Sequence, residues 1–186
     1  MHRKTNEVEE TKVKQPVNSK DRAAGAKVSE AGELLTFVVD GQHYGVDILR
    51  VQEIRGWESV TRMPNTPEHV RGVLNLRGAI VPIIDLRIRL GMPTIDYEPT
   101  TVIVVLQVMG GSSVRTMGIV VDAVSDVCAV SQGDVQDTPD FGAEVDTTFM
   151  RGIVSQGDEL LVILDVDQLL GSDASAIASA AVAEVV

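Results

Sequence analysis

Residues 71–91 read RGVLNLRGAIVPIIDLRIRLG, and residues 151–171 read RGIVSQGDELLVILDVDQLLG. The two segments have equal length and carry identical residues at six corresponding positions. A looser echo precedes each copy, GVDILRVQEI at 45–54 and GIVVDAVSDV at 118–127. Such self-similarity indicates two copies of one structural unit. Residues that both copies share are therefore expected to be scaffold, and function is expected where the copies differ.

Runs of apolar and β-branched residues, separated by turn signals, predict that most of the chain is β-structure. Asp40-Gly41 is typical of a tight hairpin turn, and the apolar run 102–109 is typical of a central strand buried on both faces. Residues 48–54 are expected to form a short helix, because apolar side chains recur there at helical spacing. The predicted strands cover residues 34–39, 43–46, 70–76, 79–84, 102–109, 117–121, 127–130, 151–154 and 160–164.

Short strands and close turns predict an all-β fold of two small five-stranded antiparallel barrels, related by the internal repeat, with a few short helices. Closing each sheet removes the exposed edges that short β-proteins must otherwise hide. One domain overall is expected, in which strands of the two repeats can interleave. Its expected parts are a disordered tail (1–32), a first barrel repeat (33–95), a second barrel repeat (96–172) and a C-terminal tail (173–186).

The aspartates and glycines that both copies share have a local explanation. Asp85 and Asp165 each follow an apolar strand and can accept backbone N–H bonds as helix N-caps. Gly91 and Gly171 are then expected to end these short helices in the left-handed conformation. Pro82 lies within a predicted strand, which indicates an edge position or a bulge because proline cannot donate to the ladder.

Charge and composition exclude several classes of protein. The net charge is −11, and residues 92–186 carry fifteen acids against two arginines. This acidic half argues against nucleic acid as a partner. The single cysteine excludes an intramolecular disulfide. Apolar runs are too short to insert into a bilayer, so a cytoplasmic protein is expected.

The sequence carries no motif for catalysis, for a metal or for a cofactor. His43 and His69 lack ligand spacing, and neither is expected to be catalytic. A small hydrolase that uses the acidic second half stays as the alternative from a different class. Five acids of this half do not follow the pattern of a calcium loop: Asp122, Asp126, Asp134, Asp137 and Asp140.

The two copies differ most in the turn of their central hairpin. The first copy turns through Asn75-Leu76-Arg77-Gly78, whereas the second uses Ser155-Gln156-Gly157-Asp158. Turn chemistry does not require a leucine and an arginine at the tip. Arginine concentrates binding energy at protein interfaces, which makes Arg77 a candidate contact. An exposed arginine held by a neighbouring carboxylate is the structural explanation, and the two interpretations are compatible.

The chain resembles the CheW family of adaptors, which couple bacterial chemoreceptors to the histidine kinase CheA. The resemblance covers about residues 33–172, and it rests on YGVDILRVQEIRG (44–56), VTRMPNTP (60–67), VRGVLNLRGAIVPIIDLR (70–87), GIVVDAVSDV (118–127) and LLVILDVDQLL (160–170). It implies two barrels packed side by side and a scaffold without catalysis or cofactor. The implied partners are the tip of a receptor's coiled-coil hairpin, the CheA regulatory domain and further copies in kinase–adaptor rings. It also implies recruitment to receptor arrays at the inner face of the membrane.

Residue roles follow from the resemblance position by position. Glu53 and Arg77 would lie at the receptor groove, where they can pair, and Gly72 would lie close by, where a side chain would obstruct the partner helix. We add Leu76 to this receptor set because of its expected place at the turn tip. An adaptor of the same fold that serves another receptor–kinase array, for surface motility or a non-motility output, is the closest alternative.

For the kinase, Leu35, Ile48 and Val51 match a hydrophobic contact at a barrel end, although all three could also be core. Phe141 matches the position of a second contact that closes the rings. Gln136, in the same loop, stands where the family carries a basic residue.

Overall fold

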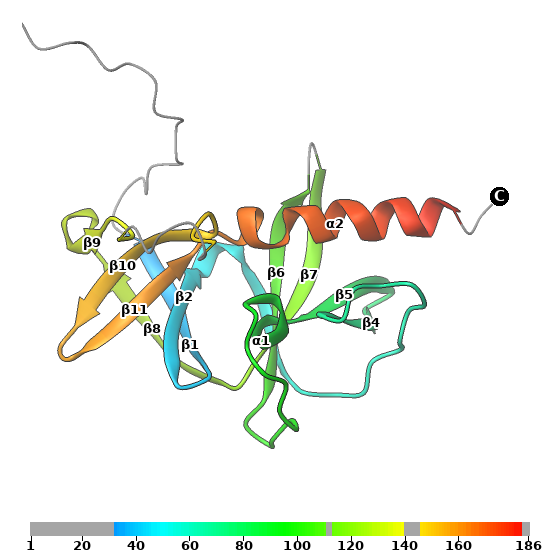
Figure 1. Ribbon diagram of the computed structural model, residues 1–186, viewed down its shortest axis with the longest axis horizontal. Coiled ribbons are helices and arrows are strands. Elements are labelled where there is room, and N and C mark those ends of the chain that lie inside the picture. The colour runs from blue at the N-terminus through cyan, green and yellow to red at the C-terminus, as the bar shows by residue number, and fades with distance from the viewer. Residues whose placement is uncertain (1–31, 111–112, 140–145, 184–186) are drawn as a thin grey trace, which may run out of the picture.

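The computed structural model describes residues 32–110, 113–139 and 146–183, which form two β-sheets and two α-helices. The six-stranded sheet has the order β8-β1-β2-β11-β10-β9, with β1 Gly32–Val39, β2 Gln42–Asp47, β8 Ala123–Val130, β9 Val135–Gln136, β10 Met150–Gln156 and β11 Glu159–Leu164. The five-stranded sheet has the order β3-β6-β7-β5-β4, with β3 Val51–Gly56, β4 Val70–Leu76, β5 Ala79–Asp85, β6 Val102–Gly110 and β7 Ser113–Val121. The predicted all-β class is confirmed (Figure 1).

Strands of the two repeats interleave between the sheets. The first sheet joins β1 and β2 to β8–β11, while the second joins β3–β5 to β6 and β7. A sheet boundary therefore does not coincide with residue 95. The two exchanged pairings, β2 with β11 and β5 with β7, are parallel, so the expectation of purely antiparallel barrels was wrong. Local sequence does not encode these pairings because their partners lie far apart along the chain.

The exchanged pairings explain why the repeat and its echo share residues. In β5, Ile83 pairs with Gly118 of β7, and in β11 the corresponding Ile163 pairs with Gly45 of β2. A Cβ atom on Gly118 would lie 2.6 Å from Ile83 Cδ1. The shared isoleucine and glycine thus form the same strand pairing in each sheet, although a Cβ on Gly45 would meet Leu34 and Leu161 instead of Ile163.

In the five-stranded sheet, the structure differs from the helix expected at 48–54 and explains the position of Pro82. The helix expected at 48–54 is only the 3₁₀ turn η1 (Ile48–Arg50), after which the chain pairs with β6 as strand β3. Pro82 lies in β5 just before the first pair with β7 at Ile83, so only β4 is its neighbour there. The missing N–H of Pro82 is tolerated for that reason.

The helices follow β5 and β11. Helix α1 (Leu86–Arg89) begins at Asp85, whose Oδ1 accepts from Ile88 N at 3.3 Å, and Gly91 after it has φ +76°, both as predicted. Helix α2 (Val166–Ala183) continues through Gly171, so the expected C-cap there was wrong. A Cβ on Gly171 would lie 3.2 Å from Met109 O, so glycine there permits close packing against β6. A further 3₁₀ turn, η2 (Gln132–Asp134), precedes β9.

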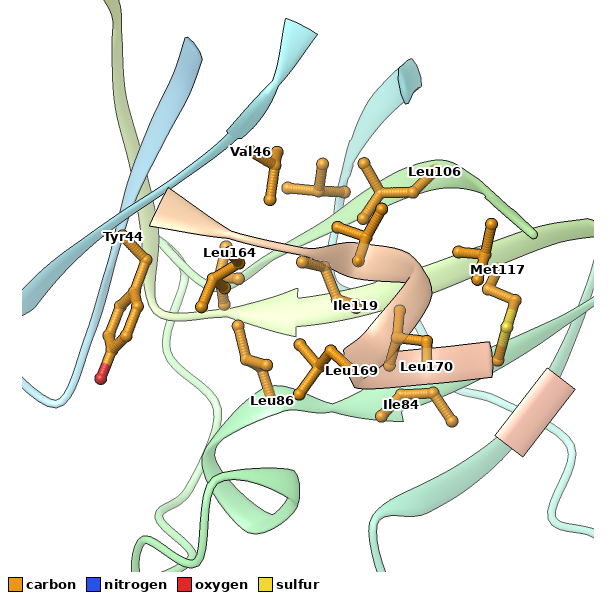
Figure 2. Close-up of a cluster of buried hydrophobic side chains, with 14 of the residues drawn as sticks. Tyr44, Val46, Ile84, Leu86, Leu106, Met117, Ile119, Leu164, Leu169 and Leu170 are labelled. Carbon is orange, nitrogen blue, oxygen red and sulfur yellow. The ribbon is translucent and has the colours of Figure 1, made fainter. Parts of the chain in front are cut away.

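Helix α2 and both sheets enclose the largest hydrophobic cluster. In Figure 1, α2 starts beside β11, crosses β6 and β7, and runs on toward the C-terminus. Figure 2 shows side chains from β2, β5, β6, β7, β11 and both helices converging on this central cluster. Each sheet also has a smaller cluster of its own, one containing Ile83 and the other Ile163. Each sheet thus has a hydrophobic cluster of its own, and the central cluster joins the two sheets.

Candidate functional site

Arg77 lies at the tip of the β4–β5 hairpin, and its side chain is 86% exposed. Its backbone is left-handed, with φ +51°, and Gly78 follows at φ +89°. Two-residue hairpin turns favour glycine or asparagine at such positions, and the corresponding residue of the second copy is Gly157, with φ +63°. The first copy therefore keeps an arginine where turn geometry favours glycine, which points to a role outside the turn.

Arg77 and Glu53 form the ion pair that the resemblance implied. Arg77 Nη2 donates to Glu53 Oε2 at 2.8 Å, and Glu53 projects from the edge strand β3. The turn itself is fixed because Asn75 Oδ1 accepts from Gly78 N at 2.9 Å. The same hairpin leaves Ile80 64% exposed, which sequence reasoning missed because strand alternation alone does not show which face is covered. A charged pair and an apolar side chain thus lie on one exposed hairpin.

Gly72 lies in β4 at a shift in the register with β5, and its φ is +144°. A Cβ atom there would lie 2.8 Å from Thr61 C and closer still to Thr61 O, below the 3.0 Å that real Cβ atoms keep. Thr61 forms a bridge with Val73 of β4. A side chain at Gly72 would therefore first meet the protein's own backbone. Its counterpart Gly152 is equally crowded, since a Cβ there would lie 2.9 Å from Gln136 O.

Two residues of the predicted sites are buried. Leu76 is the last residue of β4, is only 7% exposed and packs in the cluster with Ile83. Its side chain therefore supports the hairpin from inside instead of lying at the turn tip, which corrects the expected placement. Leu35 is 3% exposed and belongs to the central cluster, so the core interpretation applies to it.

The other predicted kinase contacts lie around η1. Ile48 and Val51 are half-buried and pack against the central cluster. Leu49 between them is 86% exposed, with its N–H bonded to Asp47 Oδ1 at 2.9 Å. Sequence periodicity did not separate Leu49 from its neighbours, because a single 3₁₀ turn sends adjacent side chains in different directions. Phe141 lies outside the described residues.

A buried arginine ties the two sheets together. Arg87 of α1 is 8% exposed; its Nη1 donates to Asp40 Oδ1 at 2.9 Å and its Nε to Asp122 Oδ1 at 2.9 Å. Asp40 lies in the β1–β2 turn, and Asp122 lies between β7 and β8. Burial by itself raises the pKa of Asp122, but hydrogen bonds from Arg87 and from the Asp40 backbone outweigh it and hold this pKa below its usual value.

Helix α2 is held by carboxylates on its inner side. Asp167 accepts from Arg50 Nη2 at 2.6 Å and from Met109 N at 2.7 Å. Asp173 is 8% exposed and lies 2.8 Å from His69 Nε2 and 3.1 Å from Arg89 Nε. These contacts fix α2 against η1, β6 and α1, and they use His69 structurally.

Three of the acids in the second half have local structural partners. Asp122 binds Arg87, Asp126 Oδ1 accepts from Val127 N, and Asp134 Oδ2 accepts from Ser131 N. Asp140 lies outside the described residues. Within the described ranges, no three His, Cys, Asp or Glu side chains are grouped so that they could hold a metal ion. None of the helices in that part of the chain is long and apolar enough to cross a membrane.

Comparisons with known proteins agree with this architecture. The family model of the CheW-like domain matches residues 33–174. The chain is 40% identical over 156 residues to the chemotaxis protein CheW of Klebsiella aerogenes, covering 84% of this chain and 90% of that protein. It is 27% identical over 152 residues to Protein FrzA of Myxococcus xanthus, covering 81% and 92%. The crystal structure of the scaffolding protein TtCheW from Thermoanaerobacter tengcongensis superposes with a TM-score of 0.68 at 30% identity, covering 75% of this chain and 92% of that one. The chain belongs to the CheW family of chemotaxis scaffold proteins.

Proposed function

We propose that the chain couples chemoreceptors to the histidine kinase CheA as a two-sided adaptor without catalytic activity. The observation that carries this proposal is Arg77, kept exposed in a left-handed turn and paired with Glu53. We assign this hairpin, which presents a charged pair and the exposed Ile80, to the tip of the receptor's coiled-coil hairpin. An adaptor acts by raising the concentration of one partner near the other, so the protein would be recruited to receptor arrays at the inner face of the membrane.

The kinase side of the proposal is the surface around η1. Leu49 exposes an apolar side chain, while Ile48 and Val51 near it in the chain pack against the central cluster. A side chain that is anchored on well-packed neighbours and is itself exposed is a good interface contact. Phe141 is proposed for the ring contact between kinase and adaptor copies.

Arg77→Ala is expected to abolish receptor capture and to leave kinase capture intact. The side chain is almost fully exposed, so its removal costs the fold little. Wild type and variant should be used to pull down partners from cell lysate, with receptors and CheA scored separately. Asp158→Ala, an exposed change in the corresponding hairpin of the second copy, is the control and should behave as wild type. A drop of several degrees in the Tm of Arg77→Ala would instead assign Arg77 to the scaffold.

Leu49→Asp is expected to lose CheA and to retain receptors. The change puts a charge into an apolar contact, while the free energy of unfolding should stay within about 0.5 kcal/mol because the side chain is exposed. Binding of the isolated kinase, measured by calorimetry, checks this result. Val114→Asp makes the same change on β7, where the side chain is 58% exposed, and should leave kinase binding unchanged. Undiminished kinase binding by Leu49→Asp would remove η1 from the interface.

The second candidate is an adaptor of this fold in another receptor–kinase array. The similarity to FrzA, whose name does not describe it as a chemotaxis protein, supports this candidate. The same pull-down separates the two: capture of a histidine kinase other than CheA would favour the second candidate.

A further inference from the structure

A polar hollow of about 800 Å³ opens between two loops beside the five-stranded sheet. One loop joins β3 to β4, and the other joins α1 to β6. The side chains used below that line it are Arg62, Glu68, Arg71, Thr94 and Asp96. Its size is within the range of ligand-binding sites and exceeds a single amino-acid residue.

The charged groups of this hollow have no ion-pair partners within the described part of the chain. That part contains nine arginines and nineteen acids, and five of the arginines form ion pairs. Carboxylates are therefore abundant, yet Arg62 and Arg71 bind none. Glu68 and Asp96 line the same hollow and are also unpaired. The hollow is thus lined by two arginines and two carboxylates that form no ion pairs with one another.

The two arginines leave the backbone at adjacent points. Thr61 bridges Val73 in antiparallel fashion, and a Cβ on Gly72 would lie 3.1 Å from Arg62 N. Because both arginines line the hollow, a carboxylate bound there would form charge-assisted hydrogen bonds with them.

The side chain of Arg71 is held in place by an aromatic cluster. Its guanidinium lies 5.6 Å from the ring centre of Tyr97, whose hydroxyl donates to the buried Asp85 Oδ2 at 2.6 Å. Trp57 packs against Tyr97, with ring centres 4.1 Å apart. Burial and the bond to Asp85 raise the pKa of Tyr97, so its hydroxyl stays a donor. This support reduces the ordering cost of binding at Arg71.

We propose that the hollow binds a peptide segment of mixed charge from a partner protein. An acidic side chain of the segment would lie against Arg62 and Arg71, and a basic one against Glu68 and Asp96. The two lining carboxylates disfavour polyanions. The hollow lies at the start of β4, about 20 Å along the strand from the Arg77 turn. It therefore lies away from the Arg77 turn, although next to Gly72, and its test does not depend on receptor binding.

The test is selection of random peptides by the full-length chain, followed by calorimetry of the enriched peptides. We expect these peptides to carry an acidic and a basic residue at a constant spacing. Their binding should weaken at least about tenfold with Arg62→Gln/Arg71→Gln and again with Glu68→Gln/Asp96→Gln. Arg115→Gln, which removes another arginine without an ion pair, is the control and should bind normally.

Three results would overturn the proposal. The first is enrichment of peptides that are apolar or uncharged, and the second is undiminished binding by both double variants. The third is displacement of the peptides by inorganic phosphate at comparable affinity, which would assign the hollow to a free anion. Circular dichroism verifies that each variant is folded, and the acidic pair supplies a test that does not depend on the stability of the arginine variant.

Discussion

Gly72→Ala is expected to lower the free energy of unfolding by about 3 kcal/mol or more. Two effects add: an L-residue at φ +144° is strained, and the new Cβ overlaps the Thr61 backbone. To relieve the overlap, the segment at Thr61 must move away and give up its two hydrogen bonds with Val73, which measure 2.8 and 3.0 Å. Urea unfolding, followed by circular dichroism, measures the loss.

Gly78→Ala is the matched control for Gly72→Ala. Gly78 also has positive φ, at +89°, but a Cβ there would have no atom within 4 Å. Its substitution should cost only the conformational strain, about 1 kcal/mol. The difference between the two variants isolates the overlap with Thr61. Equal losses in both variants would contradict this explanation and restore the alternative in which Gly72 matters only for a partner.

Arg87→Met is expected to destabilise the protein by about 3–5 kcal/mol, because it removes the shared cation of two carboxylates and leaves Asp122 partly buried without it. Arg87 also joins α1 to the β1–β2 turn of the other sheet. Arg55→Met removes an exposed arginine that pairs with Glu58 at 2.8 Å, and should cost less than about 1 kcal/mol. If both variants lost similar amounts of stability, Arg87 would contribute no more than an arginine in a surface ion pair.

Acidification should reduce the difference between wild type and Arg87→Met. The folded-state pKa of Asp122 in the wild type lies below its unfolded value of about 3.9. Its contribution is therefore complete above that value and is lost as the pH falls through the folded pKa. Without Arg87, the effect of burial on the pKa of Asp122 dominates and raises this pKa. Protonation of Asp122 at low pH then removes the buried charge that destabilises the variant. Urea midpoints of both proteins at pH 7 and near pH 3 provide the comparison.

The sequence predicted the strands well because each is bounded by its own turn signal. The β4–β5 and β10–β11 hairpins stand where the repeat placed them. Local signals failed where a distant segment decides the structure. The spacing of Ile48, Val51 and Ile54 suits a helix, but pairing with β6 draws Val51 and Ile54 into a strand. Gly171 has the sequence context of a helix end, yet it serves close packing on Met109.

The sequence predicted which hairpin presents Arg77, but it did not predict the directions of the side chains around it. The contrast between Arg77 and Gly157 singled out the β4–β5 hairpin, where the structure places Arg77 exposed and paired with Glu53. Its role as a partner contact stays a prediction. Leu76 was misplaced because the turn consists of Arg77 and Gly78, which leaves Leu76 as an inward strand residue. The exposure of Leu49 and the unpaired charges around the hollow depend on three-dimensional neighbours that no local pattern reports.

The exchange of strands between the sheets also determines when a newly synthesised chain can complete its fold. Strand β2 leaves the ribosome early, but Tyr44 must wait for Val162 of β11 before its sheet is complete. Until then an unpaired strand edge and the part of the central cluster that β11 and α2 cover stay open, which favours capture by chaperones. A product of interrupted synthesis that ends before β11 consequently lacks a complete six-stranded sheet.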